Sequence, residues 1–279
     1  HVIVAVATAG LDLAPGDPVA EGFLFIDATE TLGSPFWLPP PVQDQEALLL
    51  RGEQSRLVRT PVAPTAESRH FEIALAPPAG EGSGPASGEA RLTLTGEEGA
   101  AWVNHLATRR PEENEAEARS LLAGALPGAT FAKLAIEPSR QGVPALKITA
   151  QVQLPGFLRA GEPNPSFQLP TLRGLPASGL LEGRTLPMVL TPAVTRSVWK
   201  IRLPQGSCPP AAQDVAVRNE LGSFEQKVVL AGDLLTVERQ TEVRQRWIDP
   251  ERFPALRELA VAELKARKRM VRLECPAGR

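Results

Sequence analysis

The chain has 279 residues, of which 43% are hydrophobic and 22% charged, and its formal net charge is −2. This composition is that of a folded chain with a sizeable core, and the small net charge gives no electrostatic reason to expect binding to nucleic acid or to an anionic membrane surface. No apolar run approaches the roughly 20 residues that span a bilayer as a helix, and 28 prolines with 23 glycines favour short strands and loops.

The first 64 residues begin with two apolar runs that are typical of β-strands. The first is His1–Ala7, and the second, Phe23–Ile26, is followed directly by Asp27. Neighbouring antiparallel strands hold opposite residues roughly 5 Å apart. Such strands could therefore hold the imidazole of His1 against the carboxylate of Asp27, which would be two of the three groups of a catalytic triad. The alternative, which the spacing alone favours, is that Asp27 caps the turn at Thr29 and that His1 is exposed to water.

Residues 65–165 form a second predicted unit, with a two-helix insertion between two pairs of strands. Strict alternation of apolar and polar residues predicts strands with one buried face. The predicted strands are 71–75, 89–95, 131–136 and 146–154, and the predicted helices are 100–107 and 111–126. Pro111 and the acidic residues that follow it suit the first turn of the second helix.

Residues 166–279 form the third predicted unit, which is again rich in strands and ends in a helix. The predicted strands are 188–190, 196–203, 215–218, 222–230, 234–247 and 270–273. Asp249 and Pro250 mark the start of the helix, and its basic end, Lys265–Arg269, is interpreted as charge suited to the helix dipole rather than as a phosphate site. The predicted fold is mainly β (α+β), with antiparallel β-sandwich-like units and a few helices.

The two cysteines, Cys208 and Cys275, leave two possibilities open. They could form one disulfide, which would indicate an oxidising compartment, or they could be unrelated thiols. Neither has a second Cys or His at ligand spacing, so no metal site and no cofactor is predicted.

The remaining histidines and two tryptophans are expected to be structural. His70 and His105 are interpreted as structural or surface residues; in the alternative, the amine and imidazole of His1 chelate copper and one of these two completes the site. Trp199 and Trp247 lie in alternating strands, and they are expected in the core or on a sheet face rather than as platforms for sugars.

The N-terminal pattern resembles the end of a bacterial transglutaminase-like core. The residues that carry it are His-Val-Ile-Val-Ala-Val from His1, Phe-Leu-Phe-Ile-Asp-Ala-Thr from Phe23 and Pro-Phe-Trp-Leu-Pro from Pro35. In that family one strand bears the catalytic His and the next carries an Asp in an Asp-Pro-Thr-type motif, where this chain has Ala28 in place of the Pro. The resemblance implies that His1 is the general base and acid and that Asp27 orients it. The family's nucleophilic Cys precedes the His, so residues 1–64 would be the C-terminal remnant of the core, and the chain would be inactive by itself.

The resemblance extends along the chain to the β-rich regions that follow this core in multidomain proteins. The segments concerned are 57–61, 94–96, 199–204 and 248–257. Two functions are consistent with it. In the first, the chain is the C-terminal part of a cysteine hydrolase or acyltransferase that acts on amide bonds of a protein or peptide. In the second, it is a non-catalytic binding or structural module of an envelope or secreted protein. A periplasmic or extracellular location is expected for either.

Overall fold

The computed structural model describes most of the chain and places a small N-terminal unit beside a large mixed sheet. The described residues are 2–13, 17–29, 37–61, 67–77, 84–140, 142–157, 166–167, 169, 174–176, 182–203, 214–269 and 271–272. The mainly β character predicted from the sequence is confirmed, with three α-helices added to the strands.

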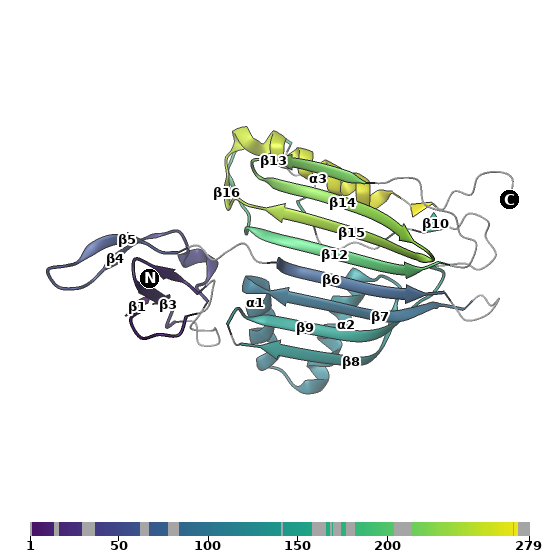
Figure 1. The fold of residues 1–279 in the computed structure, drawn as a ribbon, viewed down its shortest axis with the longest axis horizontal. Helices are drawn as coiled ribbons and strands as arrows, with labels where there is room; N and C mark the ends of the chain where they lie inside the picture. The colour runs from purple at the N-terminus through teal and green to yellow at the C-terminus, as the bar shows by residue number, and fades with distance from the viewer. Residues whose placement is uncertain are drawn as a thin grey trace.

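The N-terminal unit consists of short strands around a small core. β1 (Val4–Ala7), β2 (Val19–Ala20) and β3 (Phe23–Ile26) form an antiparallel sheet in the order β1-β3-β2. After the 3₁₀ turn η1 (Pro40–Val42), β4 (Glu46–Leu49) and β5 (Arg56–Arg59) form a hairpin. Its core contains Phe25, Leu38, Leu49 and Val58. The unit lies beyond one end of the large sheet (Figure 1).

The large sheet has eight strands, and both predicted β-rich units contribute four adjacent strands to it. The first four are β6 (Glu67–Ala76), β7 (Ala86–Thr95), β8 (Thr130–Ser139) and β9 (Ala145–Leu154). The others are β12 (Ala193–Arg202), β13 (Val215–Asn219), β14 (Gly222–Ala231) and β15 (Leu234–Val243). The order is β13-β14-β15-β12-β6-β7-β9-β8, and every pair is antiparallel except β12 with β6 (Figure 1).

Four very short strands form two further pairs outside the large sheet. β10 (Ser166–Phe167) pairs with β17 (Val271–Arg272), and β11 (Met188–Val189) pairs with β16 (Trp247–Ile248). The β11–β16 pair lies just before the last helix in the chain, so it fixes the segment from which that helix starts.

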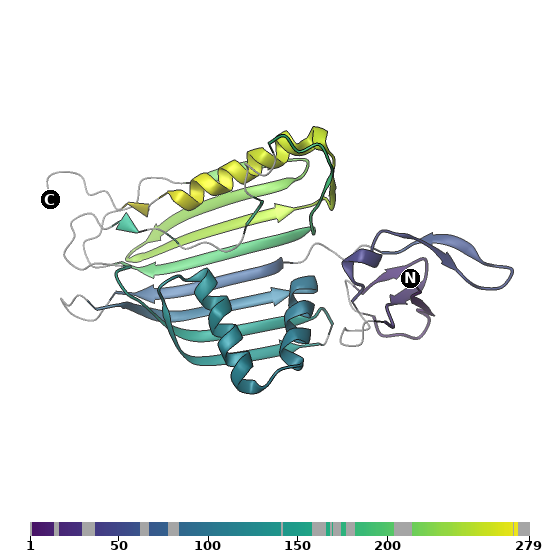
Figure 2. The same ribbon diagram turned by 180° about the vertical axis from the view of Figure 1, so that it is seen from behind.

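Three α-helices cover one face of the large sheet (Figure 2). They are α1 (Gly96–Ala107), α2 (Pro111–Ala125) and α3 (Phe253–Lys268), which follows the 3₁₀ turn η3 (Pro250–Arg252). α1 lies against β7 and β9, α2 against β8, and α3 against β13 and β14. The sequence predicted sandwich-like packing, but in the described residues helices cover the buried face. The alternating strands require a cover for their apolar side without specifying which kind of element supplies it.

The parallel contact between β6 and β12 joins the two halves of the sheet. Trp199 on β12 is buried between Phe71 on β6, at 5.8 Å between ring centroids, and Phe157, at 6.3 Å. The core cluster around them draws apolar residues from both halves, including Ile73, Leu92, Leu146, Ile148, Ile201 and Val237. No helix in the described ranges is both long enough and apolar enough to cross a membrane.

Candidate functional site: a groove beside the edge strand β13

Asp27, the predicted orienting carboxylate, lies at the end of β3 and is largely buried, with 9% of its surface exposed. Its Oδ1 accepts hydrogen bonds from the backbone N–H of Thr29 at 3.0 Å and from the Thr29 hydroxyl at 2.7 Å. These two bonds stabilise the turn that follows β3. His1 lies outside the described residues, so its contact with Asp27 stays a prediction.

The other residues singled out in the sequence divide into those that the structure places and those that it does not. Cys208 and Cys275 both lie outside the described residues, and the disulfide stays a prediction. Trp199 is buried in the core and Trp247 is 58% exposed. His70 lies half-buried on β6. Across the described ranges, no three His, Cys, Asp or Glu side chains come together in a way that could hold a metal ion.

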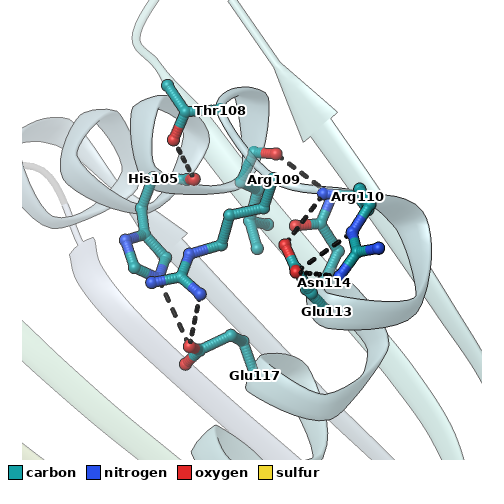
Figure 3. Close-up of polar contacts among 8 residues, drawn as sticks. His105, Thr108, Arg109, Arg110, Glu113, Asn114 and Glu117 are labelled. Carbon is teal, nitrogen blue, oxygen red and sulfur yellow. Dashed lines mark hydrogen bonds and ion pairs between the residues drawn. The ribbon is translucent and has the colours of Figure 1, made fainter.

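His105 lies in a polar contact between α1 and α2 (Figure 3). Its Nε2 is 3.6 Å from Oε1 of Glu117, which is also 3.3 Å from Nη1 of Arg109. The ring of Trp102 meets the imidazole edge to face, with 5.4 Å between centroids. Asn114 donates to the carbonyl oxygen of Leu106 at 3.1 Å, and this bond gives one of the last carbonyl groups of α1 a hydrogen-bond partner. These partly exposed contacts account for His105 as a residue that joins two helices.

The sheet face opposite the helices carries a strip of alternating charges across the parallel junction. Nζ of Lys200 donates to Oε1 of Glu72 at 2.5 Å, and Nη1 of Arg91 lies 3.7 Å from the other carboxylate oxygen. The hydrogen bond from Lys200 is the main reason why the pKa of Glu72 lies below its usual value. Because each charge has a partner in a neighbouring strand, the strip stabilises strand pairing.

A groove of about 980 Å³ lies between α3 and the edge of the sheet. One flank of α3 forms its floor over the length of the helix, with Phe253, Val261 and Ala262 as apolar members. The side chains of Val215 and Val217 on β13 form the opposite wall. Among the described residues, β13 has only β14 as a strand neighbour, so the groove lies directly beside an open sheet edge.

The rim of the groove carries more positive than negative charge. Four basic residues, Arg184, Arg257, Lys265 and Arg269, line it together with two acidic ones, Glu182 and Glu258. Both acidic residues have partners nearby: Glu182 pairs with Arg257, and Glu258 accepts a hydrogen bond from Asn219 at 3.3 Å.

Lys265 and Arg269 differ from the other basic residues of the rim. Arg184 is held by the carbonyl oxygens of Leu186 and Pro187. Within the described part of the chain, by contrast, the ammonium of Lys265 and the guanidinium of Arg269 have no carboxylate partner. Both side chains are exposed at the end of α3. The groove is therefore apolar along its floor and positively charged at one end.

A buried polar cluster fixes α3, and with it the groove floor, to the sheet. The Nε of Arg239 on β15 donates to Oε1 of Gln226 on β14 at 2.7 Å. From α3, Glu263 accepts a hydrogen bond from the backbone N–H of Leu175 at 2.8 Å and pairs with Arg267 at 3.0 Å. Burial lowers the pKa of Arg239 to about 10 and raises the pKa of Glu263.

The sequence identified the elements of the groove but not the groove itself. The strand at 215–218 and the basic helix end at Lys265–Arg269 were both predicted, the latter as charge suited to the helix dipole. A periodic pattern shows which side of an element is apolar. It does not show that β13 ends the sheet or that α3 lies beside it, so no local signal marks the site.

Comparisons with known proteins identify no relative of this chain. No family model matches the chain, and no curated protein or solved structure is significantly similar to it.

Proposed function

We propose that this chain is a polypeptide-binding module whose recognition surface is the groove between α3 and β13. The observation that carries the proposal is the position of this groove, which has an apolar floor and lies along a sheet edge that no other described strand covers. Its volume of about 980 Å³ lies at the upper end of the range of ligand pockets.

The shape of the groove favours a chain-like ligand over a compact one. The floor follows α3, whose 16 residues give a length of roughly 24 Å at about 1.5 Å per residue. A polypeptide segment covers such a length with several side chains, and the floor offers contacts to each of them in turn. Polypeptide ligands commonly bind at sheet edges and in helix-lined grooves.

The test is selection from a random-peptide phage library on the purified chain. Val261→Arg places a long charged side chain over the middle of the floor and should abolish enrichment. Val229→Arg is the matched control, because Val229 is 56% exposed on β14 and does not line the groove. The melting temperatures of both variants show whether they are folded. Equal enrichment on wild type and on folded Val261→Arg would refute the proposal.

A second candidate function keeps the expectation of a transglutaminase-like parent enzyme, and the burial of Asp27 at the end of β3 favours it. In this proposal His1 is the base, Asp27 orients it, and the thiolate comes from a part of the parent outside these 279 residues. Incorporation of a primary amine into a glutamine-containing peptide, measured on that parent, should fall steeply for Asp27→Asn and little for Thr29→Ser. Unchanged activity of Asp27→Asn would exclude the role of Asp27.

A further inference from the structure

We propose that the groove takes its peptide as an additional antiparallel strand on β13, with acidic side chains of the peptide facing Lys265 and Arg269. This inference rests on the proposed peptide-binding function and specifies the chemistry and conformation of the partner segment. It follows from the backbone of β13, from the contrast between the two sheet edges and from the charge at one end of the groove.

The backbone groups of β13 that no other described strand pairs with can be assigned from the register of β13 with β14. The N–H of Val228 on β14 donates towards β13, to Oδ1 of Asp214 at 2.8 Å. Because N–H groups alternate in direction along a strand, Gly222, Phe224 and Gln226 also direct theirs towards β13, to their partners Asn219, Val217 and Val215. Ala216 and Arg218 therefore direct their N–H and C=O groups away from the sheet, towards the position of an added strand.

The two edges of the sheet are built differently. β8, at the far edge, contains a bulge between Ala132 and Ala135, Lys133 at a φ of 47°, and Pro138 within the strand. Bulges, prolines and lysines of this kind prevent further strands from pairing with an edge. β13 pairs with β14 in a regular register and contains neither a bulge nor a proline. Within the described part of the chain, the edge beside the groove is thus the one left able to accept a strand.

An added strand would point half of its side chains into the groove. Val215 and Val217 face α3 from β13, and the side chains of a partner strand alternate between the same two sides. Residues of the peptide that bond to Ala216 and Arg218 direct their side chains to the open face. The residues between them direct theirs towards α3.

The direction of β13 sets the order of residues in the peptide. Asn219 donates to the carbonyl oxygen of Ala255 near the start of α3. Val215 is level with Gln226, whose partner Arg239 donates to Ala266 near the helix end. β13 therefore runs opposite to α3. A peptide antiparallel to β13 runs in the same direction as α3, so its first residues contact the apolar floor and its last residues contact the basic end.

The spacing of the basic pair matches acidic residues at alternate positions of a strand. Lys265 and Arg269 are one helical turn apart, or about 6 Å along the axis. Residues i and i+2 of a strand are separated by roughly 6.6 Å. The preferred peptide therefore carries two apolar residues followed by two acidic ones, all at alternate positions.

The experiment uses the fluorescently labelled peptide Thr-Val-Thr-Val-Thr-Asp-Thr-Asp and measures its affinity for the full chain by anisotropy. N-methylation of the Thr amides removes the donors that face β13 and should weaken binding by about tenfold or more. N-methylation of the Val and Asp amides, which face away from β13, should leave affinity within about twofold. Equal effects of the two methylated peptides would overturn strand addition.

Variants of the chain test the same contacts from the other side. Ala216→Pro removes one outward N–H and should weaken binding, while Ala216→Val keeps this donor and should not. Lys265→Glu with Arg269→Glu should weaken binding by about tenfold and favour a peptide with Lys in place of Asp. Lys268→Glu is the control for long-range charge, since Lys268 does not line the groove.

The outcomes separate this inference from the function on which it rests. If library peptides bind in a manner sensitive to Val261→Arg but the designed peptide does not bind, strand addition by an acidic segment is wrong and peptide binding stands. The same conclusion follows if the charge reversal has no more effect than Lys268→Glu. If no peptide binds the folded chain, both proposals fail.

Discussion

The guanidinium of Arg239 donates a hydrogen bond from Nη2 to the carbonyl oxygen of Ala266 at 2.9 Å. This bond joins the middle of β15 to the last turns of α3, and Nε of Arg239 donates a second hydrogen bond to Gln226 on β14. A buried guanidinium must keep its acceptors, because leaving it without them is costly. The position of the groove floor therefore depends on this cluster.

The first prediction concerns Glu263, whose carboxylate balances the positive charges of Arg239 and Arg267. Glu263→Ala would leave the buried guanidinium of Arg239 and the partly buried guanidinium of Arg267 without the carboxylate beside them, and it should lower the free energy of unfolding by about 3 kcal/mol. Urea denaturation measures this loss. Glu251→Ala, at an exposed position before α3, is the control and should change stability by less than about 0.5 kcal/mol. A comparable loss in both variants would show that the cluster does not anchor the helix.

The second prediction is the pH dependence contributed by Glu72. The folded-state pKa of Glu72 lies below the reference value of 4.5, chiefly because Lys200 hydrogen-bonds to its carboxylate. Below pH 4.5, Glu72 binds a proton more readily in the unfolded chain than in the folded one. The stabilisation that the Glu72 carboxylate contributes is therefore complete above pH 4.5 and is lost as the pH falls through its folded-state pKa.

The free energies of unfolding of wild type and Glu72→Gln, measured with urea, should therefore converge as the pH is lowered. At neutral pH they should differ by less than about 1 kcal/mol. The small size follows from the partial exposure of the carboxylate. Adding Lys200→Met to both chains should flatten the dependence, because it removes the main cause of the pKa shift. A difference that persists unchanged at low pH would argue against this role of Glu72.

The third prediction concerns Trp199, which fills the junction between the halves of the sheet. Trp199→Ala should cost about 4 kcal/mol, because it removes the ring that contacts Phe71 and Phe157. Among the described residues the buried indole N–H has no acceptor. Trp199→Phe removes that unpaired donor and keeps an aromatic ring, so its cost should stay below about 1.5 kcal/mol. Thermal unfolding compares the stabilities of the two variants, and Trp247→Ala, at an exposed position, is the control.

Local sequence patterns were sufficient for individual elements. The separator Ala231–Asp233 became the β14–β15 turn, in which Gly232 has a φ of 64°. Asp249 and Pro250 marked the start of the last helical segment, although its first turn is a 3₁₀ turn and α3 begins at Phe253. Each of these signals is carried by residues close together in the chain.

The arrangement of those elements could not be predicted in the same way. Trp199 pairs with Ile73 across the parallel junction, and neither strand carries a pattern that identifies its partner. The alternating strands require an apolar cover, which the sequence assigned to a second sheet and which the structure supplies as helices. The groove depends on both features, because it exists only where α3 covers the end of a single sheet.

The last prediction uses two glycines that should respond to the same substitution with opposite signs. A Cβ on Gly88 of β7 would overlap the backbone carbonyl of Ala74 on β6. Gly88→Ala must therefore push apart two strands in the centre of the sheet, and it should cost about 2 kcal/mol or more.

Gly124 lies within α2, where a Cβ meets nothing within 4 Å. Gly124→Ala should instead stabilise the chain by about 0.5–1 kcal/mol, because alanine loses less backbone entropy in a helix. Urea midpoints that move in the same direction for both variants would contradict the close approach of β6 and β7 at Gly88.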